Sequence, residues 1–276
     1  MYNSKVKNKY KIVGIAAIIF CFTSCEVEPI QSLPDKNYKL VWSDEFDSDS
    51  GNSVDPNKWA FDLGTGQNGW GNNELQSYTD KPENIKHDGQ GNLLITAVKG
   101  SNGDYTSARI KTEGIFTQKF GKIEARIKTP TGSGIWPAFW MLGSDFDQIG
   151  WPECGEIDIM EQNGSKSDIT YSSLHGPGYS AGEAITTPYS IRNSRFDSDF
   201  HIYAVEWGEN YVDFFVDNYL FKRLTPSDVA GEWVYNKSFF LILNVAVGGG
   251  FVSPPNDNTP FPQSLTVDYV RVYEEL

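Results

Sequence analysis

The sequence predicts an all-β domain, a sandwich of antiparallel sheets, on three observations. Short runs rich in Val, Ile, Phe and Tyr recur from residue 38 onward, and each has the length of a strand. Turn sequences such as DGQGN, SNGD and TPTGSG separate these runs. No amphipathic helical pattern of a dozen residues and no fixed-period repeat interrupts this order. The pattern is therefore that of a β-sandwich and not of alternating strands and helices.

The predicted strands are short and rich in β-branched and aromatic residues. They are 93–98 (LLITAV), 122–128 (KIEARIK), 200–207 (FHIYAVEW), 211–216 (YVDFFV), 239–247 (FFLILNVAV) and 265–273 (LTVDYVRVY). The composition agrees, because 26 glycines, 14 prolines and 14% aromatic residues suit many short strands with turn-rich connections. A chain of 276 residues can form one sandwich of this kind as a single unit.

The first 24 residues have the features of an export signal. Four lysines within residues 5–11 precede an apolar stretch, 12–22, that is too short to span a bilayer as a helix. The following FTSC resembles a bacterial lipobox, which implies cleavage before Cys25 and a lipid on its sulfur. The alternative is an ordinary secretory signal with an incidental cysteine. We expect a lipoprotein signal peptide at 1–24, a polar tether at 25–37 and one domain at 38–276, anchored by lipid to the bacterial cell envelope, at the outer membrane or cell surface.

Charge and cysteine content exclude several classes of partner. The formal net charge of −13 opposes binding to nucleic acid or to an anionic membrane, and more weakly to a sulfated polymer. The charge does not oppose binding of a neutral polymer.

Only Cys154 lies beyond the leader, so the domain has no internal disulfide, and we expect this thiol to be a small buried filler.

The segment most informative about chemistry is 151–161, WPECGEIDIME, which carries three acids. Alternate residues of a strand share a face, so Glu156 and Asp158 lie together, whereas Glu161 would point the opposite way. One extra residue, a β-bulge around Ile159 and Met160, returns Glu161 to the first face. The alternative is a solvated acidic strand, which the intervening isoleucines and flanking tryptophans disfavour.

The spacing of the two glutamates predicts a reaction type. With the bulge, the Cα atoms of Glu156 and Glu161 lie ~13 Å apart at ~3.3 Å per residue. If both side chains lean inward, the carboxyl groups lie about 5–6 Å apart, near the ~5–5.5 Å of retaining glycosidases and below the ~6.5–9.5 Å of inverting ones. The spacing therefore favours double displacement.

The motif GEIDIME resembles the active-site signature of glycoside hydrolase family 16 in its bulged form. The resemblance covers roughly residues 38–276 and implies a jelly-roll β-sandwich of two antiparallel sheets with a concave substrate cleft. Within the family, GIWPAFWM with WPECGEIDIME most resembles the bacterial laminarinases, which are endo-β-1,3-glucanases, whereas lichenases carry an unbulged EIDIE. Further family-like blocks are VWSDEF (41–46), GWGNNELQSYT (69–79), FGKIEARIK (120–128), GIWPAFWMLG (134–143), NVAVGGGF (244–251) and VDYVRVY (267–273).

The resemblance implies a role for each acid. Glu156 is expected to be the nucleophile and Glu161 the general acid/base, while Asp158 hydrogen-bonds the nucleophile and tunes its charge. The two glutamates must hold different protonation states near neutral pH, and crowding of like charges raises the pKa of one of them. No cofactor is expected for catalysis.

Three tryptophans, Trp136, Trp140 and Trp151, are candidate sugar platforms, because the apolar C–H faces of pyranose rings stack on indole. Trp136 and Trp140 are four residues apart and share a face if their strand is regular. The alternative for each is a core position. Three weaker candidates for sugar contacts are Arg109, His175 and Asn72; a surface ion pair and a structural role are the alternatives for the first two.

The resemblance also implies a structural calcium ion on the convex face. The matching positions are Glu45, the carbonyl of Gly91, and Asp268, and hard oxygen ligands of this kind suit calcium. The alternative is that Asp268 is only an acid at the end of a strand.

Three functions compete. The first is an endo-acting retaining β-glucanase, a monomer that hydrolyses laminarin-type β-1,3-glucan and also mixed-linkage β-1,3-1,4-glucan. The second is a galactanase of the same family, of the β-agarase, porphyranase or carrageenase type, which the acidic charge and the context of the motif disfavour. The third is a non-catalytic β-glucan-binding protein, which the presence of all three acids disfavours.

Overall fold

The computed structural model describes Gln31 and residues 36–276. The predicted signal peptide, Cys25 and most of the tether lie outside the described residues, so those assignments stay predictions. Within the described part, no helix is both long and apolar enough to cross a membrane.

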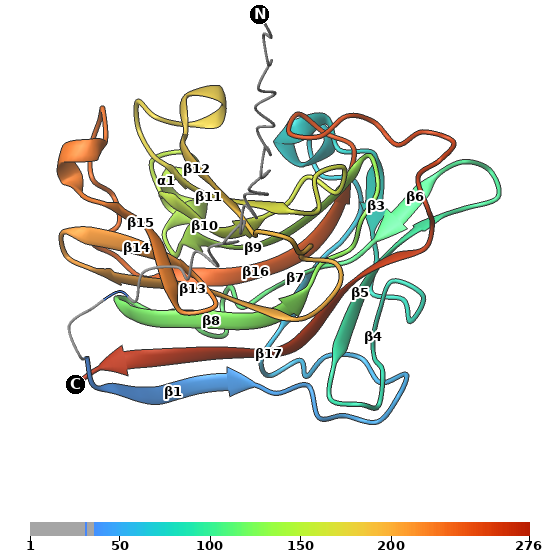
Figure 1. Cartoon of the computed structure of the whole chain (residues 1–276), viewed down its shortest axis with the longest axis horizontal. Helices are drawn as coiled ribbons and strands as arrows, with labels where there is room; N and C mark the ends of the chain where they lie inside the picture. Colours follow the sequence, from blue (N-terminus) through green and yellow to red (C-terminus); the bar gives the residue numbers. More distant parts are fainter. Residues whose placement is uncertain (1–30, 32–35) are drawn as a thin grey trace, which may run out of the picture. The chain divides into compact units, whose positions relative to one another are not determined.

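The described domain consists of two β-sheets in which every strand pair is antiparallel except that of β3 with β6 (Figure 1). The larger sheet has the strand order β15 (Tyr219–Leu224), β14 (Tyr211–Val216), β13 (His201–Gly208), β8 (Gly121–Lys128), β17 (Gln263–Glu275), β5 (Leu93–Lys99), β6 (Tyr105–Ser107) and β3 (Gln76–Tyr78). Two more strands pair at its side, β1 (Tyr38–Asp44) with β17 and β4 (Ile85–His87) with β5. The smaller sheet has the order β12 (Ile185–Ser190), β11 (Ile169–His175), β10 (Glu156–Glu161), β9 (Ile135–Gly143), β16 (Phe239–Val247), β7 (Arg109–Lys111) and β2 (Ala60–Asp62).

Helical structure in the described residues is limited to single turns. The strands predicted from the sequence all form, and their ends lie within two residues of the predicted ones. The all-β sandwich is thus confirmed. The short helical segments are α1 (Phe146–Ile149), a π-helical turn (Gly69–Asn73) and two 3-10 turns (Ala181–Glu183 and Pro226–Asp228).

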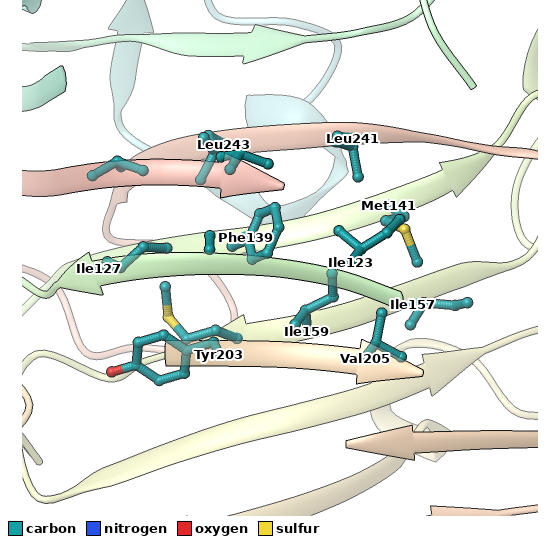
Figure 2. Packing of buried hydrophobic residues seen from close by; sticks show 14 of the residues in the cluster. Ile123, Ile127, Phe139, Met141, Ile157, Ile159, Tyr203, Val205, Leu241 and Leu243 are labelled. Atoms are coloured by element: carbon teal, nitrogen blue, oxygen red, sulfur yellow. The ribbon is translucent and has the colours of Figure 1, made fainter. Parts of the chain in front are cut away.

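The core lies between the two sheets and is built from alternate residues of their strands (Figure 2). In the smaller sheet, Phe139 and Met141 of β9 and Ile157 of β10 are fully buried. In the larger sheet, Ile123 and Ile127 of β8 are equally buried. Because alternate residues point to opposite faces, the residues between these positions on β9 and β10 face away from the core. The outer face of the smaller sheet is therefore the surface on which β10 displays its acids.

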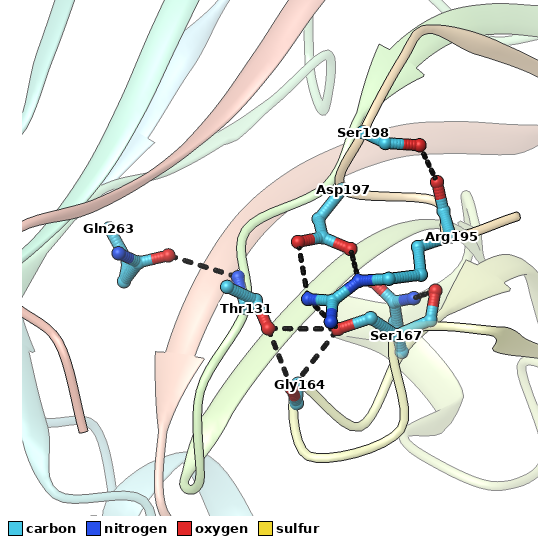
Figure 3. Close-up of polar contacts among 8 residues, drawn as sticks. Thr131, Gly164, Ser167, Arg195, Asp197, Ser198 and Gln263 are labelled. Carbon is cyan, nitrogen blue, oxygen red and sulfur yellow. Dashed lines mark hydrogen bonds and ion pairs between the residues drawn. The ribbon is translucent and has the colours of Figure 1, made fainter. Parts of the chain in front are cut away.

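Three loops are tied together next to the end of β10 (Figure 3). Thr131, after β8, donates its hydroxyl to the carbonyl of Gly164 at 3.2 Å and shares a 2.8 Å hydrogen bond with Ser167, both in the β10–β11 loop. Arg195, after β12, reaches the Ser167 hydroxyl at 3.5 Å and forms a paired contact with Asp197 at 2.7 and 2.8 Å. These contacts fix where the acidic strand ends and where β11 begins.

The packed domain begins before the predicted boundary at residue 38. Lys36 donates from Nζ to the Tyr211 hydroxyl at 2.7 Å and to the Glu206 carboxylate at 3.2 Å. The carbonyl of Asn37 accepts the backbone N–H of Leu276 at 2.9 Å. The last two residues of the predicted tether therefore pack against the domain, because side-chain hydrogen bonds hold Lys36 and a main-chain hydrogen bond holds Asn37.

Candidate active site

The β-bulge predicted in β10 is present. Between Asp158 and Glu161 the pairing register shifts against both neighbouring strands, β9 and β11. Ile159 and Met160 fill this interval on β10, whereas β11 places only Ser172 opposite them. Ile159 is 2% exposed and Met160 is fully buried, so both point into the core. Two consecutive inward residues return Glu161 to the outer face.

Cross-strand pairing sets the neighbours of the acids. Glu156 lies opposite His175 of β11, and Asp158 lies between Trp140 of β9 and Ser173 of β11. Partners across an antiparallel ladder share a face, so the acids, the histidine, the indole and the hydroxyl all lie on the outer face. The sheet thus collects a compact polar group around β10.

The carboxyl groups strongly perturb one another. Burial raises the pKa of Asp158 well above its usual range, and the charges of Glu156 and Glu161 raise it further. Burial, followed by the charge of Glu156, raises the pKa of Glu161 to about 7, although His175 and the hydrogen bond from Trp136 oppose this increase. Glu161 therefore keeps a proton in much of the neutral range, as a general acid must.

His175, predicted to contact sugar, lies beside the acidic group, and its contact with sugar stays a prediction. Its Nε2 lies 3.0 Å from Oδ2 of Asp158 and 3.7 Å from Oε1 of Glu156. Burial lowers the pKa of His175, but the hydrogen bond and charge of Asp158, with the two glutamates, outweigh burial and raise it to about 9. Nδ1 accepts the backbone N–H of Ala181 at 3.2 Å, which leaves the ring proton on Nε2 and opposes a second proton on Nδ1. Nε2 of His175 thus faces the carboxyl group of Asp158 at ion-pair distance, without an aligned hydrogen bond.

Two of the predicted tryptophans donate to the glutamates. Trp136 donates its indole N–H to Oε1 of Glu161 at 2.9 Å, and Trp151 donates to Oε2 of Glu156 at 2.8 Å. The pairing of β9 with β16 is continuous, so Trp136 and Trp140 share the outer face as predicted. Trp151 remains 41% exposed, which leaves its ring free to contact a ligand beside Glu156. The indole edges hold the carboxylates, and stacking of sugar on their faces stays a prediction.

Arg109 lies on the same sheet face but is already engaged. Its Nε lies 2.8 Å from Oδ2 of Asp62. Its guanidinium carbon lies 4.7 Å from the ring centroid of Trp70 and 4.8 Å from that of Trp140. Trp140 is itself held by a 2.8 Å hydrogen bond from its indole N–H to Asn244. The ion pair considered as the alternative for Arg109 is therefore present, and its contact with sugar stays a prediction. The contact with Trp70 was not predicted from the sequence, where this tryptophan is marked only by the glycines around it.

Asn72 holds a loop that packs against Trp136. Its carbonyl accepts the N–H of Gly250 at 2.8 Å, and its side-chain amide donates to Glu74 at 3.3 Å. Gly249 has φ +107, and a Cβ there would lie 2.9 Å from the Trp136 ring, so only glycine fits between them. Asn72 is therefore placed at the border of the site, while its predicted sugar contact stays a prediction.

Two aromatic residues that were not singled out from the sequence lie near Glu161. Phe251 lies 5.2 Å from Trp136 and 5.3 Å from Tyr171 between ring centroids, and Tyr171 lies opposite Glu161 in the sheet. The sequence carries only a weak signal for either residue. Tyr171 can be placed opposite Glu161 only when the bulged register is known, and Phe251 is marked only by the three glycines before it.

Cys154 is the buried filler that the sequence predicted. It is fully buried and packs with Leu142, Phe240 and Ile242 beneath Trp140. Burial and nearby negative charge raise the pKa of its thiol to about 12, so it stays protonated and unreactive.

The residues predicted to bind calcium do not gather as a site. Both carboxylates are paired with arginine: Glu45 with Arg271 at 2.8 and 3.0 Å, and Asp268 with Arg126 at 2.5 Å. Gly91 faces a different acid, because a Cβ there would lie 3.3 Å from Oδ1 of Asp47. The arginines satisfy the negative charge that a calcium ion would need, so this donor set does not fit the ion as it stands.

The arrangement around β10 supports acid and nucleophilic chemistry at one bond. One carboxyl group on this face keeps a proton near neutral pH, and a second carboxylate lies on the same strand and face. Such a pair can protonate a leaving oxygen and attack the carbon that it leaves.

Comparisons with known proteins point to the same chemistry. The family model for glycosyl hydrolases family 16 matches residues 72–270. The chain is 40% identical over 248 residues to a beta-glucanase of Rhodothermus marinus, which covers 86% of this chain and 85% of that protein. It resembles the laminarinase catalytic domain of Thermotoga maritima, with a TM-score of 0.82, 46% identity, and coverage of 87% of this chain and 100% of that one. The endo-beta-1,3-glucanase of Pyrococcus furiosus gives a TM-score of 0.82 at 41% identity, covering 87% and 96%.

Proposed function

The chain belongs to glycosyl hydrolases family 16 and is a glycoside hydrolase, and we propose that it cleaves β-1,3-glucan internally with retention of configuration. The observation that carries this proposal is the bulged strand β10, which displays Glu156, Asp158 and Glu161 on one face with Glu161 protonated up to a pH of about 7. The relatives that act on β-1,3-glucan match nearly the whole domain and support this substrate class.

The reaction has two steps, and each step uses a different protonation state of Glu161. Glu156 attacks the anomeric carbon while Glu161 gives its proton to the departing glycosidic oxygen, which forms a covalent glycosyl-enzyme. Glu161, now ionised, accepts a proton from water as that water attacks the same carbon and releases Glu156. Two inversions give net retention. The chemistry needs no cofactor, because two carboxyl groups supply both the proton and the nucleophile.

Neighbouring groups prepare the nucleophile. Trp151 donates its indole N–H to Glu156, which stabilises the negative charge that attack requires. Asp158 lies between the two glutamates along β10, and Nε2 of His175 lies 3.0 Å from its carboxyl group and 3.7 Å from that of Glu156.

The test of the substrate class is a product profile on four polysaccharides. Laminarin should give oligosaccharides of mixed length from the start, as endo cleavage requires, and lichenan should be cut at a lower rate. Agarose and carrageenan should be left intact. Cleavage of agarose or carrageenan in preference to laminarin would assign the chain to the galactanases of the family, and binding of laminarin without any product would support a non-catalytic role.

A structural calcium ion held by Glu45, the Gly91 carbonyl and Asp268, apart from catalysis, stays a prediction from the family resemblance. It would require both carboxylates to leave their arginine partners. A bound ion stabilises the native state by mass action, so a chelator should lower the melting temperature of the wild type, and Asp268→Ala should remove that response. A melting temperature that a chelator does not change, in protein shown to be metal-free, would remove the proposal.

A lipid anchor at Cys25 and a monomeric state are also proposed. The lipobox-like FTSC and the polar segment after it support an anchored domain at the cell envelope. Metabolic labelling with a fatty acid should mark the wild type but not Cys25→Ser. Sedimentation of the domain without residues 1–25 should give the mass of one chain, and a stable dimer would contradict the monomer.

A further inference from the structure

A buried asparagine on β16, Asn244, holds Trp140 from the side away from the acids. In the sheet, Trp140 lies opposite Asp158 of β10 on one side and opposite Ile242 of β16 on the other. Its indole N–H donates to Oδ1 of Asn244, two residues further along β16, at 2.8 Å. Asn244 is 5% exposed, so both ends of its amide have to find hydrogen-bond partners within the protein.

A chain of hydrogen bonds continues from Asn244 to a carboxylate. Nδ2 of Asn244 donates to the hydroxyl of Tyr78 at 3.1 Å, and that hydroxyl donates to Oε2 of Glu74 at 3.2 Å. The two ends fix the direction of every bond, because an indole N–H can only donate and an ionised carboxylate can only accept. The amide of Asn244 must therefore turn its oxygen toward Trp140 and its nitrogen toward Tyr78.

The carboxylate at the end of this chain is itself held in place. Nε2 of Gln76 donates to Oε2 of Glu74 at 2.6 Å, and Nδ2 of Asn72 donates to its Oε1 at 3.3 Å. Gln76 is fully buried, and its Oε1 accepts the backbone N–H of Val247 at 2.7 Å. The chain thus joins the segment 72–78 to strand β16 and reaches Trp140 from an end that accepts three hydrogen bonds.

The other contacts of the Trp140 ring do not select its orientation. The guanidinium carbon of Arg109 lies 4.8 Å from the ring centroid, and the apolar side chains of Leu142, Phe240 and Ile242 pack against the ring. Stacking and apolar contact are similar in the two orientations that differ by half a turn about the Cβ–Cγ bond, a torsion that is broad and roughly two-fold. The hydrogen bond to Asn244 distinguishes them, because only one of them brings the N–H to the amide oxygen.

We propose that Asn244 is a positioning residue for Trp140. Its amide oxygen, held in place through Tyr78 and Glu74, selects the orientation in which the indole lies beside the acids of β10 and meets a bound glucan chain. Asn244 acts through Trp140 and not on the substrate. The effect on glucan rests on the proposed function, whereas the orientation of the indole does not.

The first measurement observes Trp140 directly and needs no activity. Nitrogen-15 labelling of the tryptophans gives a signal for each indole N–H, and that of Trp140 is assigned by its loss in Trp140→Phe. Its exchange with deuterium should be about fivefold to tenfold faster in Asn244→Leu, which removes the acceptor and keeps the volume. Asn244→Asp, which keeps an oxygen at that place, should keep the exchange slow. Tyr78→Phe, which removes only one hydroxyl, should accelerate it less.

Asn84 provides a matched control for the loss of a buried asparagine. It is fully buried, and its Nδ2 donates to the carbonyl of Thr96 at 3.0 Å and to the hydroxyl of Thr106 at 3.1 Å. Asn84→Leu should lower the melting temperature and leave the exchange of the Trp140 indole at its wild-type rate. Equal acceleration in Asn84→Leu and Asn244→Leu, or an unchanged rate in both Asn244→Leu and Tyr78→Phe, would overturn the proposal.

Kinetics on laminarin test whether this orientation matters to the substrate. In Asn244→Leu the KM should rise about fivefold with a smaller change in kcat, because a contact made in both the ground state and the transition state is weakened. In Trp140→Phe the further change Asn244→Leu should have no added effect, since Asn244 acts only through the indole N–H. Additive losses in the double variant would overturn the positioning role. A wild type that hydrolyses none of the four polysaccharides would overturn the proposed function, and the exchange rates would still decide whether Asn244 orients Trp140.

Discussion

Glu161 shows how burial of one carboxyl group serves the reaction. Its environment raises its pKa to about 7, mainly through burial and secondly through the charge of Glu156. The neutral acid can then donate a proton, and the ionised form that follows is a stronger base than an exposed glutamate. The same environment must disfavour the ionised form of Glu161 in the folded state.

The first prediction concerns stability and pH. Because the folded-state pKa of Glu161 is raised from its ordinary value of 4.5 to about 7, the folded state holds this proton more tightly than the unfolded state. The free energy of unfolding should therefore fall as the pH rises from about 4.5 through 7, by about 3 kcal/mol at 1.36 kcal/mol per pH unit. Glu161→Gln, which cannot ionise, should lose this dependence and be more stable than the wild type at pH 8. Urea unfolding at pH 5 and pH 8 measures both. Equal pH dependence in the two proteins would contradict the raised pKa.

The sequence predicted which residues form the site better than it predicted what each contacts. The shared face of the acids, and that of the two strand tryptophans, followed from alternation and spacing, which a strand translates directly into faces. His175 was named only because it follows the acidic strand in the sequence. The partners of Arg109 could not be identified in that way, because Asp62 and Trp70 come from segments distant in sequence. Tyr171 was missed because its position opposite Glu161 depends on the register of β11 against the bulge.

At the scale of elements, strand β10 depends on one extra residue. Ile159 and Met160 both point into the core, and this pair returns Glu161 to the face of Glu156. A regular strand achieves the same result with one residue fewer, because positions i and i+4 share a face. The number of residues between the acids, and not the bulge as such, determines whether the site forms.

The second prediction follows from that count. Deletion of Met160 should make β10 regular and keep both glutamates on the outer face, so hydrolysis of laminarin should be reduced but detectable. It should also cost about 2–5 kcal/mol of stability, because a fully buried methionine side chain is lost. Deletion of both Ile159 and Met160 should turn Glu161 toward the core and abolish activity. Activity in the double deletion but not in the single one would contradict the assigned faces.

The bulge could be predicted from the sequence, whereas the contacts between distant loops could not. Apolar residues at two consecutive positions between acids leave one arrangement in which all three acids avoid the core, so the bulge followed from the sequence. The loop contacts around Thr131 and Arg195 did not, since they join turns after three different strands. The arginine partners of Glu45 and Asp268 could not be predicted for a related reason, because each arginine comes from another strand.

At the scale of the whole molecule, charge distinguishes among polymers. The formal net charge is −13, so an anionic polysaccharide approaches against the field of the protein, whereas a neutral glucan does not. Two antiparallel sheets with a buried interior could be predicted from alternation alone. The strand order, which places β16 between β9 and β7, could not, because long-range pairing is not encoded in local patterns.

The third prediction compares laminarin with sulfated laminarin. At low salt the sulfated polymer should be hydrolysed with a much lower kcat/KM, because repulsion reduces productive encounter. Raising the ionic strength shortens the screening length from about 30 Å at 0.01 M to about 8 Å at 0.15 M, so the difference should narrow. The rate on neutral laminarin, as the control, should change little. A preference for the sulfated polymer at low salt would contradict this account and favour the galactanase alternative.

The most direct test of the account is the configuration of the azide formed by two variants with an activated β-glucoside substrate. In Glu161→Ala the nucleophile remains, so the glycosyl-enzyme forms, stalls for lack of a base, and is attacked by azide from the face opposite Glu156 to give a β-glycosyl azide. In Glu156→Ala azide occupies the place of the nucleophile and should give the α-glycosyl azide. Proton NMR of the products distinguishes the two. The account predicts the β-azide from Glu161→Ala and the α-azide from Glu156→Ala, and the reverse pair would exchange the roles of the two glutamates and contradict its central claim.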